Sequence, residues 1–227
     1  MNFQANEIGW LCEEQNCSFF FGNRDSHFEN LRRYFPTFKF ARLHQVHGDS
    51  ILESKTELLE APQADAHFTK IPGLALIAIT ADCVPILIFD PKEKTLAAVH
   101  AGWRGVALKI LPKTIQKLQA LGSKPENLKI AFGPHIQFES FEVGTDVKTK
   151  ILSSISKVEA HHFKDLGKDK SKVNLAAVLC SQLLEISPQL APGFMSKEDS
   201  FSNLELHSFR RDSKSAGRQL SYVALKT

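Results

Sequence analysis

One cysteine and two histidines lie at the ends of short apolar runs, and these residue types are well suited to chemistry. Cys83 separates two runs rich in Ile, Val, Leu and Ala, His100 ends a third run, and His47 precedes Gly48 in a turn. Strand ends and loops are where rigid elements present functional side chains. Thiolate and imidazole are preferred ligands of zinc, and a catalytic zinc commonly has three protein ligands and an open fourth position. The trio is therefore a candidate metal site.

The same three residues admit other interpretations. Their separations along the chain match no short zinc-finger spacing, so Cys83 could be a small buried hydrophobe and the histidines could be hydrogen-bonded in the core. Cys83 could also be the nucleophile of a metal-free cysteine hydrolase, with His47 or His100 as its base. Glycines close to both histidines favour a site, because glycine lets the backbone approach a ligand closely.

Residues beside the trio could bind a substrate. Trp103 and Arg104 follow His100 and place an aromatic plane next to a bidentate anion binder. This combination suits a ligand that carries a base and a phosphate. Arg104 is therefore the first candidate for binding phosphate, and Gln45 is a weaker candidate for a hydrogen bond to the substrate.

Several other polar residues have two possible roles. Asp82, which precedes Cys83, could orient a ligand histidine or simply cap a turn. His135 follows a Gly-Pro turn and could line the pocket, although histidines in loops are more often solvated. Arg210 and Arg211 could bind an anion, although a solvated basic turn is the more common arrangement.

Buried strands must position these residues. Short runs that are rich in branched apolar residues and bounded by Asp, Gly or Pro are typical of such strands. The predicted strands are Leu74–Ile79, Pro85–Phe89, Leu96–Val99, Leu128–Phe132 and Gln219–Leu225. Near the N-terminus, Trp10, Phe19–Phe21 and the region Phe35–Phe40 could supply edge strands, and Glu29–Tyr34 predicts a short helix.

Apolar periodicity predicts helices in the second half of the chain. The segment Val106–Leu121 is amphipathic, and Pro112 inside it should kink or restart the helix. Asn174–Ile186 is a second helix, and Thr145 is the expected N-cap of another. Residues 157–173 are mostly polar and predict no regular structure. The apolar face of the segment Val106–Leu121 consists of Leu108, Leu111, Ile115 and Leu118.

Length and composition limit the fold and the function. The 227 residues predict a single domain over residues 1–227, and the lack of a strict strand–helix alternation favours an α+β mixed sandwich over a doubly wound sheet. A net charge of +3 gives no sign of a nucleic-acid surface. The sequence contains no secretory signal, no apolar stretch of membrane-spanning length and only four unpatterned cysteines, which predicts a cytoplasmic protein. It does not indicate an oligomeric state.

The order of several motifs resembles the laccase-domain family once called multicopper polyphenol oxidases. These motifs are HQVHGDSI, ADAHFTK, TADCVPILIFDP, VHAGWRG, GPHI, FEVG and SFRRD, and the resemblance covers about residues 40–226. Members of that family are described as purine nucleoside phosphorylases with adenosine deaminase and methylthioadenosine phosphorylase activity, and in some bacteria as a peptidoglycan editing factor. The resemblance implies an α/β sandwich, purine nucleosides and phosphate as substrates, and a catalytic zinc bound by His47, Cys83 and His100.

The sequence departs from the family pattern outside the trio. The N-terminal part, residues 1–40, is divergent and shortened, and FFFGNRDSHFENL lacks the family's paired glycines. Asn174 replaces an aspartate, Phe209 replaces a tyrosine, and a cysteine common in the family is absent near Met195. The resemblance therefore implies an intact metal site with an altered substrate rim. A peptidoglycan-editing or binding protein without nucleoside activity remains an alternative.

Copper is a weaker expectation than zinc. A multicopper oxidase couples a His₂Cys site to further copper clusters held by many histidines. This chain has nine histidines and no His-x-His pair. The sequence therefore argues against a true laccase.

Overall fold

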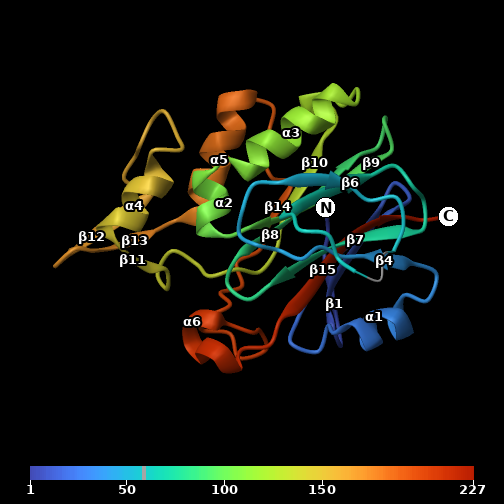
Figure 1. The fold of residues 1–227 in the computed structure, drawn as a ribbon, viewed down its shortest axis with the longest axis horizontal. Helices are drawn as coiled ribbons and strands as arrows, with labels where there is room; N and C mark the ends of the chain where they lie inside the picture. The colour runs from blue at the N-terminus through green and yellow to red at the C-terminus, as the bar shows by residue number, and fades with distance from the viewer. Residues whose placement is uncertain (58–59) are drawn as a thin grey trace.

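Three of the predicted apolar runs form the central strands of the fold. The computed structural model describes residues 1–57 and 60–227. In it, the runs form β7 (Leu74–Thr80), β8 (Val84–Asp90) and β9 (Thr95–Ala101), as predicted. β8 and β9 pair as an antiparallel hairpin, whereas β7 belongs to a different sheet. Figure 1 shows two large sheets with helices above and below them.

The first sheet is antiparallel except at one edge, where β4 runs parallel to β7. The predicted C-terminal strand lies inside this sheet. Its six strands, in spatial order, are β1 (Gln4–Asn6), β2 (Gly9–Glu14), β3 (Cys17–Gly22), β15 (Gln219–Leu225), β7 and β4 (Lys39–Ala41). The expectation that Phe19–Phe21 would form an edge strand is wrong, because β3 is an interior strand whose residues are all buried.

The second sheet is built around the hairpin of β8 and β9. Parallel neighbours occur only at its two edges, where β14 joins β10 and β5 joins β6. Its six strands, in spatial order, are β14 (Phe194–Met195), β10 (Lys129–Phe132), β8, β9, β6 (Ala66–Thr69) and β5 (Ile51–Glu53).

Apolar side chains fill the space between the sheets and both outer faces. Phe19 from the first sheet packs edge-on against Phe89 from the second, with ring centroids 6.3 Å apart. Leu31 of α1 (Phe28–Tyr34) covers the outer face of the first sheet, and α3 (Ile110–Ala120) and α5 (Leu175–Ile186) cover the outer face of the second. Burying one large apolar side chain contributes about 1.5–3 kcal/mol, so these layers supply most of the stabilisation.

A buried histidine links the two sheets. His67 of β6 accepts a hydrogen bond from the Ser54 hydroxyl at Nδ1 (2.9 Å) and donates one from Nε2 to the Ile77 carbonyl oxygen in β7 (3.1 Å). Both ring nitrogens are therefore satisfied in the neutral form. Burial disfavours the charged imidazolium and lowers the pKa of His67 to about 4.

The predicted helix Val106–Leu121 is two helices. Lys109 has a left-handed backbone (φ 61°) and separates α2 (Trp103–Ala107) from α3. The interruption places Pro112 in the first turn of α3, where its missing N–H costs no hydrogen bond. It also turns Leu108 away from the predicted apolar face, so that this side chain is 47% exposed.

The remaining helices agree with the sequence apart from one cap. Asn174 caps α5, as its side chain accepts a hydrogen bond from the Ala177 backbone N–H. Thr145 is the first residue of α4, and Gly144 is its N-cap. The helices after α1 are α2 (Trp103–Ala107), α3 (Ile110–Ala120), α4 (Thr145–Leu152), α5 (Leu175–Ile186) and α6 (Phe209–Asp212), with 3₁₀ turns at Pro125–Asn127 and Ser213–Ser215.

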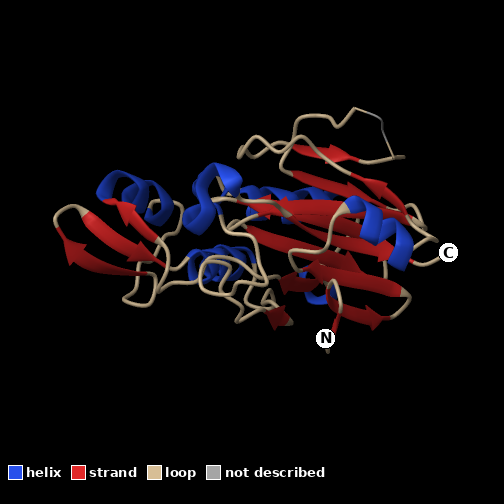
Figure 2. Cartoon of the chain, turned by 90° about the horizontal axis from the view of Figure 1, so that it is seen from below, coloured by secondary structure: helices blue, strands red, loops and turns tan. Residues whose placement is uncertain are grey.

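Regular structure within residues 157–173 corrects the prediction of none. β12 (Phe163–Gly167) and β13 (Lys170–Val173) form a hairpin that pairs with β11 (Glu142–Gly144) in a third, three-stranded sheet. β12 is mostly exposed, so no alternation of apolar residues marks it in the sequence. Figure 2 shows this small sheet projecting from one end of the molecule. In the residues that the structure describes, no helix is both long and apolar enough to cross a membrane.

Candidate metal centre

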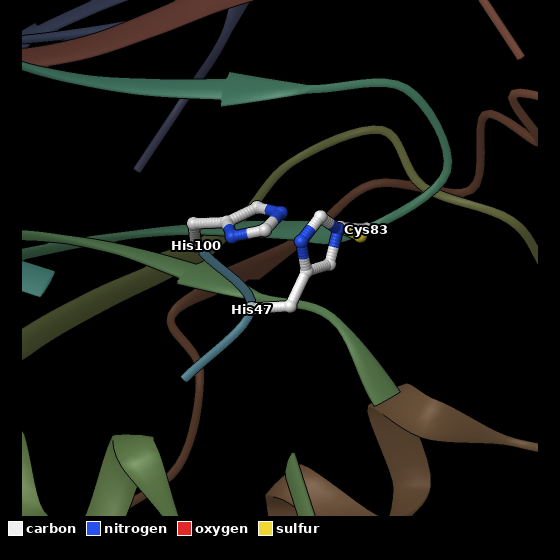
Figure 3. Close-up of side chains that lie close together, drawn as sticks. All are labelled: His47, Cys83 and His100. Atoms are coloured by element: carbon white, nitrogen blue, oxygen red, sulfur yellow. The ribbon is translucent and has the colours of Figure 1, made fainter. Parts of the chain in front are cut away.

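His47, Cys83 and His100 lie together at one end of the second sheet. One possible ligand atom from each lies within 4.8 Å of the others. His100 is the penultimate residue of β9, and Cys83 immediately precedes β8. The hairpin register pairs Val84 with Ala101 and so brings Cys83 beside the end of β9. Figure 3 shows the ring of His47, from the loop between β4 and β5, turned toward the other two side chains.

Asp65 orients both histidines. Its carboxylate accepts a hydrogen bond from His100 Nδ1 (2.8 Å) and three more from the backbone N–H groups of Val46, His47 and Gly48 (3.2, 2.9 and 2.7 Å). These bonds hold His47 in a left-handed conformation (φ 61°) that a non-glycine residue adopts only at a cost. Burial opposes the charged carboxylate, but the hydrogen bonds outweigh it and lower the pKa of Asp65.

The donor set fits a zinc ion. Because His100 Nδ1 donates to Asp65, its Nε2 is the nitrogen left to bind a metal, and a carboxylate behind a ligand histidine is typical of zinc sites. Burial raises the pKa of Cys83, but the charges and hydrogen bonds of His100 and His47 outweigh burial and lower it to about 6. Burial lowers the pKa of His100, but Cys83 and Asp65 outweigh it and raise it to about 9. The site thus stabilises the thiolate, the form that binds metals.

Gly102 leaves room for the cluster. A Cβ at this position would lie 3.0 Å from both Cys83 Sγ and His47 Cδ2, closer than side chains normally approach. Its φ of −73° is accessible to any residue, so space rather than backbone conformation requires the glycine. The glycine therefore lets the backbone lie close to two members of the trio.

The cluster opens into a cavity of about 660 Å³. This volume falls within the ~300–1,000 Å³ typical of pockets for small molecules. Gln45, Trp103 and Arg104 line it, as the sequence suggests for a substrate site. Arg104 lies over the Trp103 ring, with its guanidinium carbon 4.4 Å from the ring centroid. Gln45 has a structural role as well, since its amide exchanges two hydrogen bonds with the Ile79 backbone (2.7 and 2.8 Å).

Asp82 lines the cavity but does not orient a ligand histidine. Its carboxylate accepts hydrogen bonds from the Ser200 hydroxyl (2.7 Å) and the Arg210 backbone N–H (2.6 Å). It therefore fixes the C-terminal segment beside Cys83, whereas Asp65 holds the histidines. The ADAHFTK motif contains the orienting carboxylate, and its position directly before a strand paired with β9 is the signal that could have identified it.

The other predicted polar residues differ in their placement. His135 is buried outside the cavity and donates from Nδ1 to the Gly133 carbonyl oxygen (2.7 Å). Arg211 is neither solvated nor free for an anion, because it pairs with Asp212 and donates to several backbone carbonyl oxygens. Arg210 does line the cavity. The sequence did not single out three further lining residues: Phe141, Leu175 and Arg218.

Comparison with known proteins places the chain in a family. The family described as multi-copper polyphenol oxidoreductase laccase matches residues 12–226. The chain belongs to this family. The match includes most of the N-terminal part that the motifs alone left outside the resemblance. Among the residues that the structure describes, the trio is the single cluster of His, Cys, Asp or Glu that could hold a metal ion, which does not provide the several copper centres of the family's title.

Relatives and solved structures agree with this assignment. A purine nucleoside phosphorylase from Deinococcus radiodurans is 31% identical, over 82% of this chain and 70% of its own length. The purine nucleoside phosphorylase YfiH of Shigella flexneri is 32% identical, over 89% of this chain and 82% of its own. The hypothetical protein YfiH of Bacillus licheniformis has the same fold, with a TM-score of 0.90, 22% identity and 99% coverage of both chains.

Proposed function

We propose that the protein is a zinc-dependent purine nucleoside phosphorylase. The observation that carries the proposal is the His47–Cys83–His100 cluster at the wall of a cavity that also contains Arg104 and Trp103. Two relatives with about one third of their residues identical bear the name purine nucleoside phosphorylase, which supports the same activity. Adenosine deamination and phosphorolysis of methylthioadenosine are further activities that the cavity could accommodate.

The cluster would hold the zinc through the two imidazoles and the thiolate of Cys83. When bound, a zinc ion supplies Lewis-acid polarisation of an oxygen atom. Asp65 would keep His100 in the tautomer that presents Nε2, and it would keep the loop of His47 closed on the site. Gly102 would leave the ligand atoms free to approach one another.

The polar residues of the cavity would bind the two substrates. The Arg104 guanidinium, which lies over the Trp103 ring, would bind phosphate through paired N–H groups. Gln45 retains one amide N–H beyond its bond to the Ile79 carbonyl, and this group would donate to the nucleoside. A phosphate oxygen would then bond to the anomeric carbon of the ribose as the glycosidic bond breaks. The base would leave with the electron pair and take up a proton.

A substrate panel tests the proposal. Adenosine, inosine and methylthioadenosine are incubated with the protein with and without phosphate, and release of base and of ammonia is measured. We expect phosphate-dependent release of base that falls at least 100-fold in His47→Ala, as expected when a catalytic metal loses a ligand. His44→Ala is the matched control, because His44 lines the same cavity outside the trio and should leave the metal content intact. Equal turnover in wild type and His47→Ala would refute the site.

A metal-free cysteine hydrolase is the second candidate. The lowered pKa of Cys83 and its two imidazole neighbours favour it, because thiolates beside histidine are good nucleophiles. Metal content separates the two candidates. Roughly stoichiometric zinc that disappears in Cys83→Ala supports the phosphorylase, whereas metal-free protein that forms a covalent adduct at Cys83 supports the hydrolase.

A protein without enzymatic activity on nucleosides is the third candidate. A protein that works in peptidoglycan editing or by binding alone would release no base from any nucleoside in the panel. We also propose a cytoplasmic location, for which the four free cysteines are the supporting observation.

A further inference from the structure

The cavity contains three arginines, and each lies over an aromatic ring that lines the same cavity. The guanidinium carbon of Arg104 is 4.4 Å from the Trp103 ring centroid. The corresponding pairs, Arg210 on Phe141 and Arg218 on Phe209, are separated by 5.5 and 5.9 Å. Cation–π attraction can hold a guanidinium over an aromatic ring while its N–H groups remain able to bind an anion.

The positive charges of these arginines outnumber the one carboxylate among the described lining residues. Within residues 1–57 and 60–227, no carboxylate forms an ion pair with Arg104, Arg210 or Arg218, whereas the neighbouring Arg211 pairs with Asp212. Asp82 is the one carboxylate among the lining residues of that described part, and its two oxygens accept from Ser200 and the Arg210 backbone. A cavity with three unpaired guanidinium groups favours ligands with more than one anionic group.

The arginines are held by different parts of the chain. Arg104 lies on α2, whereas Arg210 and Arg218 belong to the C-terminal segment that includes α6 and lie over Phe141 and Phe209. Figure 1 shows α2 and α6 as separate elements. Phosphorolysis consumes a single phosphate, for which Arg104 is the proposed partner. Arg210 and Arg218 therefore have no anion to bind in the proposed reaction.

Arg210 and Arg218 each use only Nη1 to hydrogen-bond backbone carbonyl oxygens. Arg210 donates from one Nη1 to the Glu142 carbonyl oxygen (2.8 Å). Arg218 donates from Nη1 to the carbonyl oxygens of Ala216 and Gly217 (2.8 and 2.7 Å). A guanidinium has five N–H donors, so the Nε and Nη2 groups of both side chains remain for a bidentate contact.

We propose that Arg210 and Arg218 form a second anion subsite that binds the 5′-phosphate of a nucleotide, so that nucleoside 5′-monophosphates are preferred substrates. This inference rests on the proposed phosphorylase activity and specifies its substrate class. In a nucleoside the ring oxygen joins C1′, which carries the base, to C4′, which carries the exocyclic C5′. A nucleotide whose C1′ faces Arg104 and the trio therefore extends its 5′-phosphate away from them, toward another wall of the cavity.

A nucleotide and phosphate react in the same way as a nucleoside and phosphate. A phosphate oxygen bonds to C1′ and the glycosidic bond breaks. Its electron pair leaves with the base, which takes up a proton, and the other product is 5-phosphoribose 1-phosphate. No oxidant, reductant or further reactant is needed.

The test compares AMP with adenosine in two measurements. The first is kcat/KM for phosphate-dependent release of adenine by the zinc-loaded protein, and the second is the dissociation constant of each ligand by calorimetry. We expect wild type to favour AMP by about 10- to 100-fold, the range of one or two charge-assisted hydrogen bonds. Arg210→Gln and Arg218→Gln should each bring that ratio toward 1. Arg33→Gln is the matched control, because Arg33 stacks on Tyr34 in α1 outside the cavity and should keep the wild-type ratio.

The two proposals fail in different ways. If adenosine is turned over but AMP is no better, and neither variant changes the ratio, the subsite is refuted while the phosphorylase stands. If no ligand releases base but AMP binds more tightly than adenosine through Arg210 and Arg218, the phosphorylase is refuted and the subsite stands. Arg210→Lys keeps the charge, so partial recovery of the ratio there separates anion binding from a folding defect.

Discussion

Asp65→Asn is the substitution that best separates positioning from ligation. The carboxylate accepts four hydrogen bonds, from His100 Nδ1 and from the backbone N–H groups of Val46, His47 and Gly48. None of these donors can reverse its role, because three are backbone N–H groups and the fourth must leave Nε2 free for a metal. An amide of the same shape has a single accepting atom, so the substitution removes half of this set.

The loss of unfolding free energy depends on which two of the four hydrogen bonds are lost. With the introduced NH₂ at the Oδ2 position, the N–H groups of Val46 and Gly48 lose their acceptor. With NH₂ at the Oδ1 position, His47 and His100 lose theirs. Asp65 is almost fully buried, and a buried donor without a partner costs about 1–3 kcal/mol, so two cost about 2–6 kcal/mol of unfolding free energy. Loss of the histidine's carboxylate partner should weaken metal binding by about 10- to 100-fold.

Zinc affinity by competition with a chromogenic chelator is the primary assay, and urea unfolding gives the stability. Asp90→Asn is the matched control, because Asp90 is also a buried carboxylate but lies at the opposite end of β8 from Cys83, where Oδ1 accepts from the turn after the strand. An asparagine amide oxygen can keep both of these hydrogen bonds, so this variant should retain the zinc affinity of wild type. A zinc affinity of Asp65→Asn within about twofold of wild type would show that the carboxylate does not position the ligands.

Two further substitutions test the surroundings of the site and the sheet interface. Gly102→Ala should weaken zinc binding about tenfold with a stable fold, since its Cβ displaces Cys83 and His47. Gly193→Ala is the control and should bind zinc normally, because its Cβ would make only an ordinary contact, 3.8 Å from the Ile130 carbonyl oxygen. His67, with its pKa lowered to about 4, keeps its full contribution to stability above pH 6.5 and loses about 3 kcal/mol as the pH falls toward 4. His67→Gln should therefore flatten unfolding free energy against pH in that window, and a slope equal to that of wild type would contradict the assignment.

The sequence predicts the elements whose environment is uniform along their length. The apolar runs of β7, β8 and β9 are buried on both faces, so composition alone identifies them. Pro112 predicts the restart of the helix, because only a first-turn position avoids its missing N–H. The hairpin of β12 and β13 has no such signal, since backbone pairing rather than apolar burial holds it together.

The sequence predicted the three residues that the structure brings together, but not the carboxylate that orients two of them. His47, Cys83 and His100 are recognisable because each ends an apolar run beside glycine or a turn. The choice between Asp65 and Asp82 as the orienting carboxylate depends on strand pairing, which places Asp65 behind β9 and leaves Asp82 to hold the C-terminal segment. Long-range register of this kind is not encoded in local spacing.

The central claim is that nucleoside phosphorolysis depends on a metal held by His47, Cys83 and His100. Phosphorus NMR of the protein with adenosine and phosphate tests this claim most directly. The protein is measured as purified, after its metal is removed with a chelator, and after zinc is restored. We predict ribose 1-phosphate in equal amount to the adenine released, its disappearance on metal removal and its return with zinc. An unchanged yield from the chelated protein, or release of adenine without consumption of phosphate, would contradict the claim.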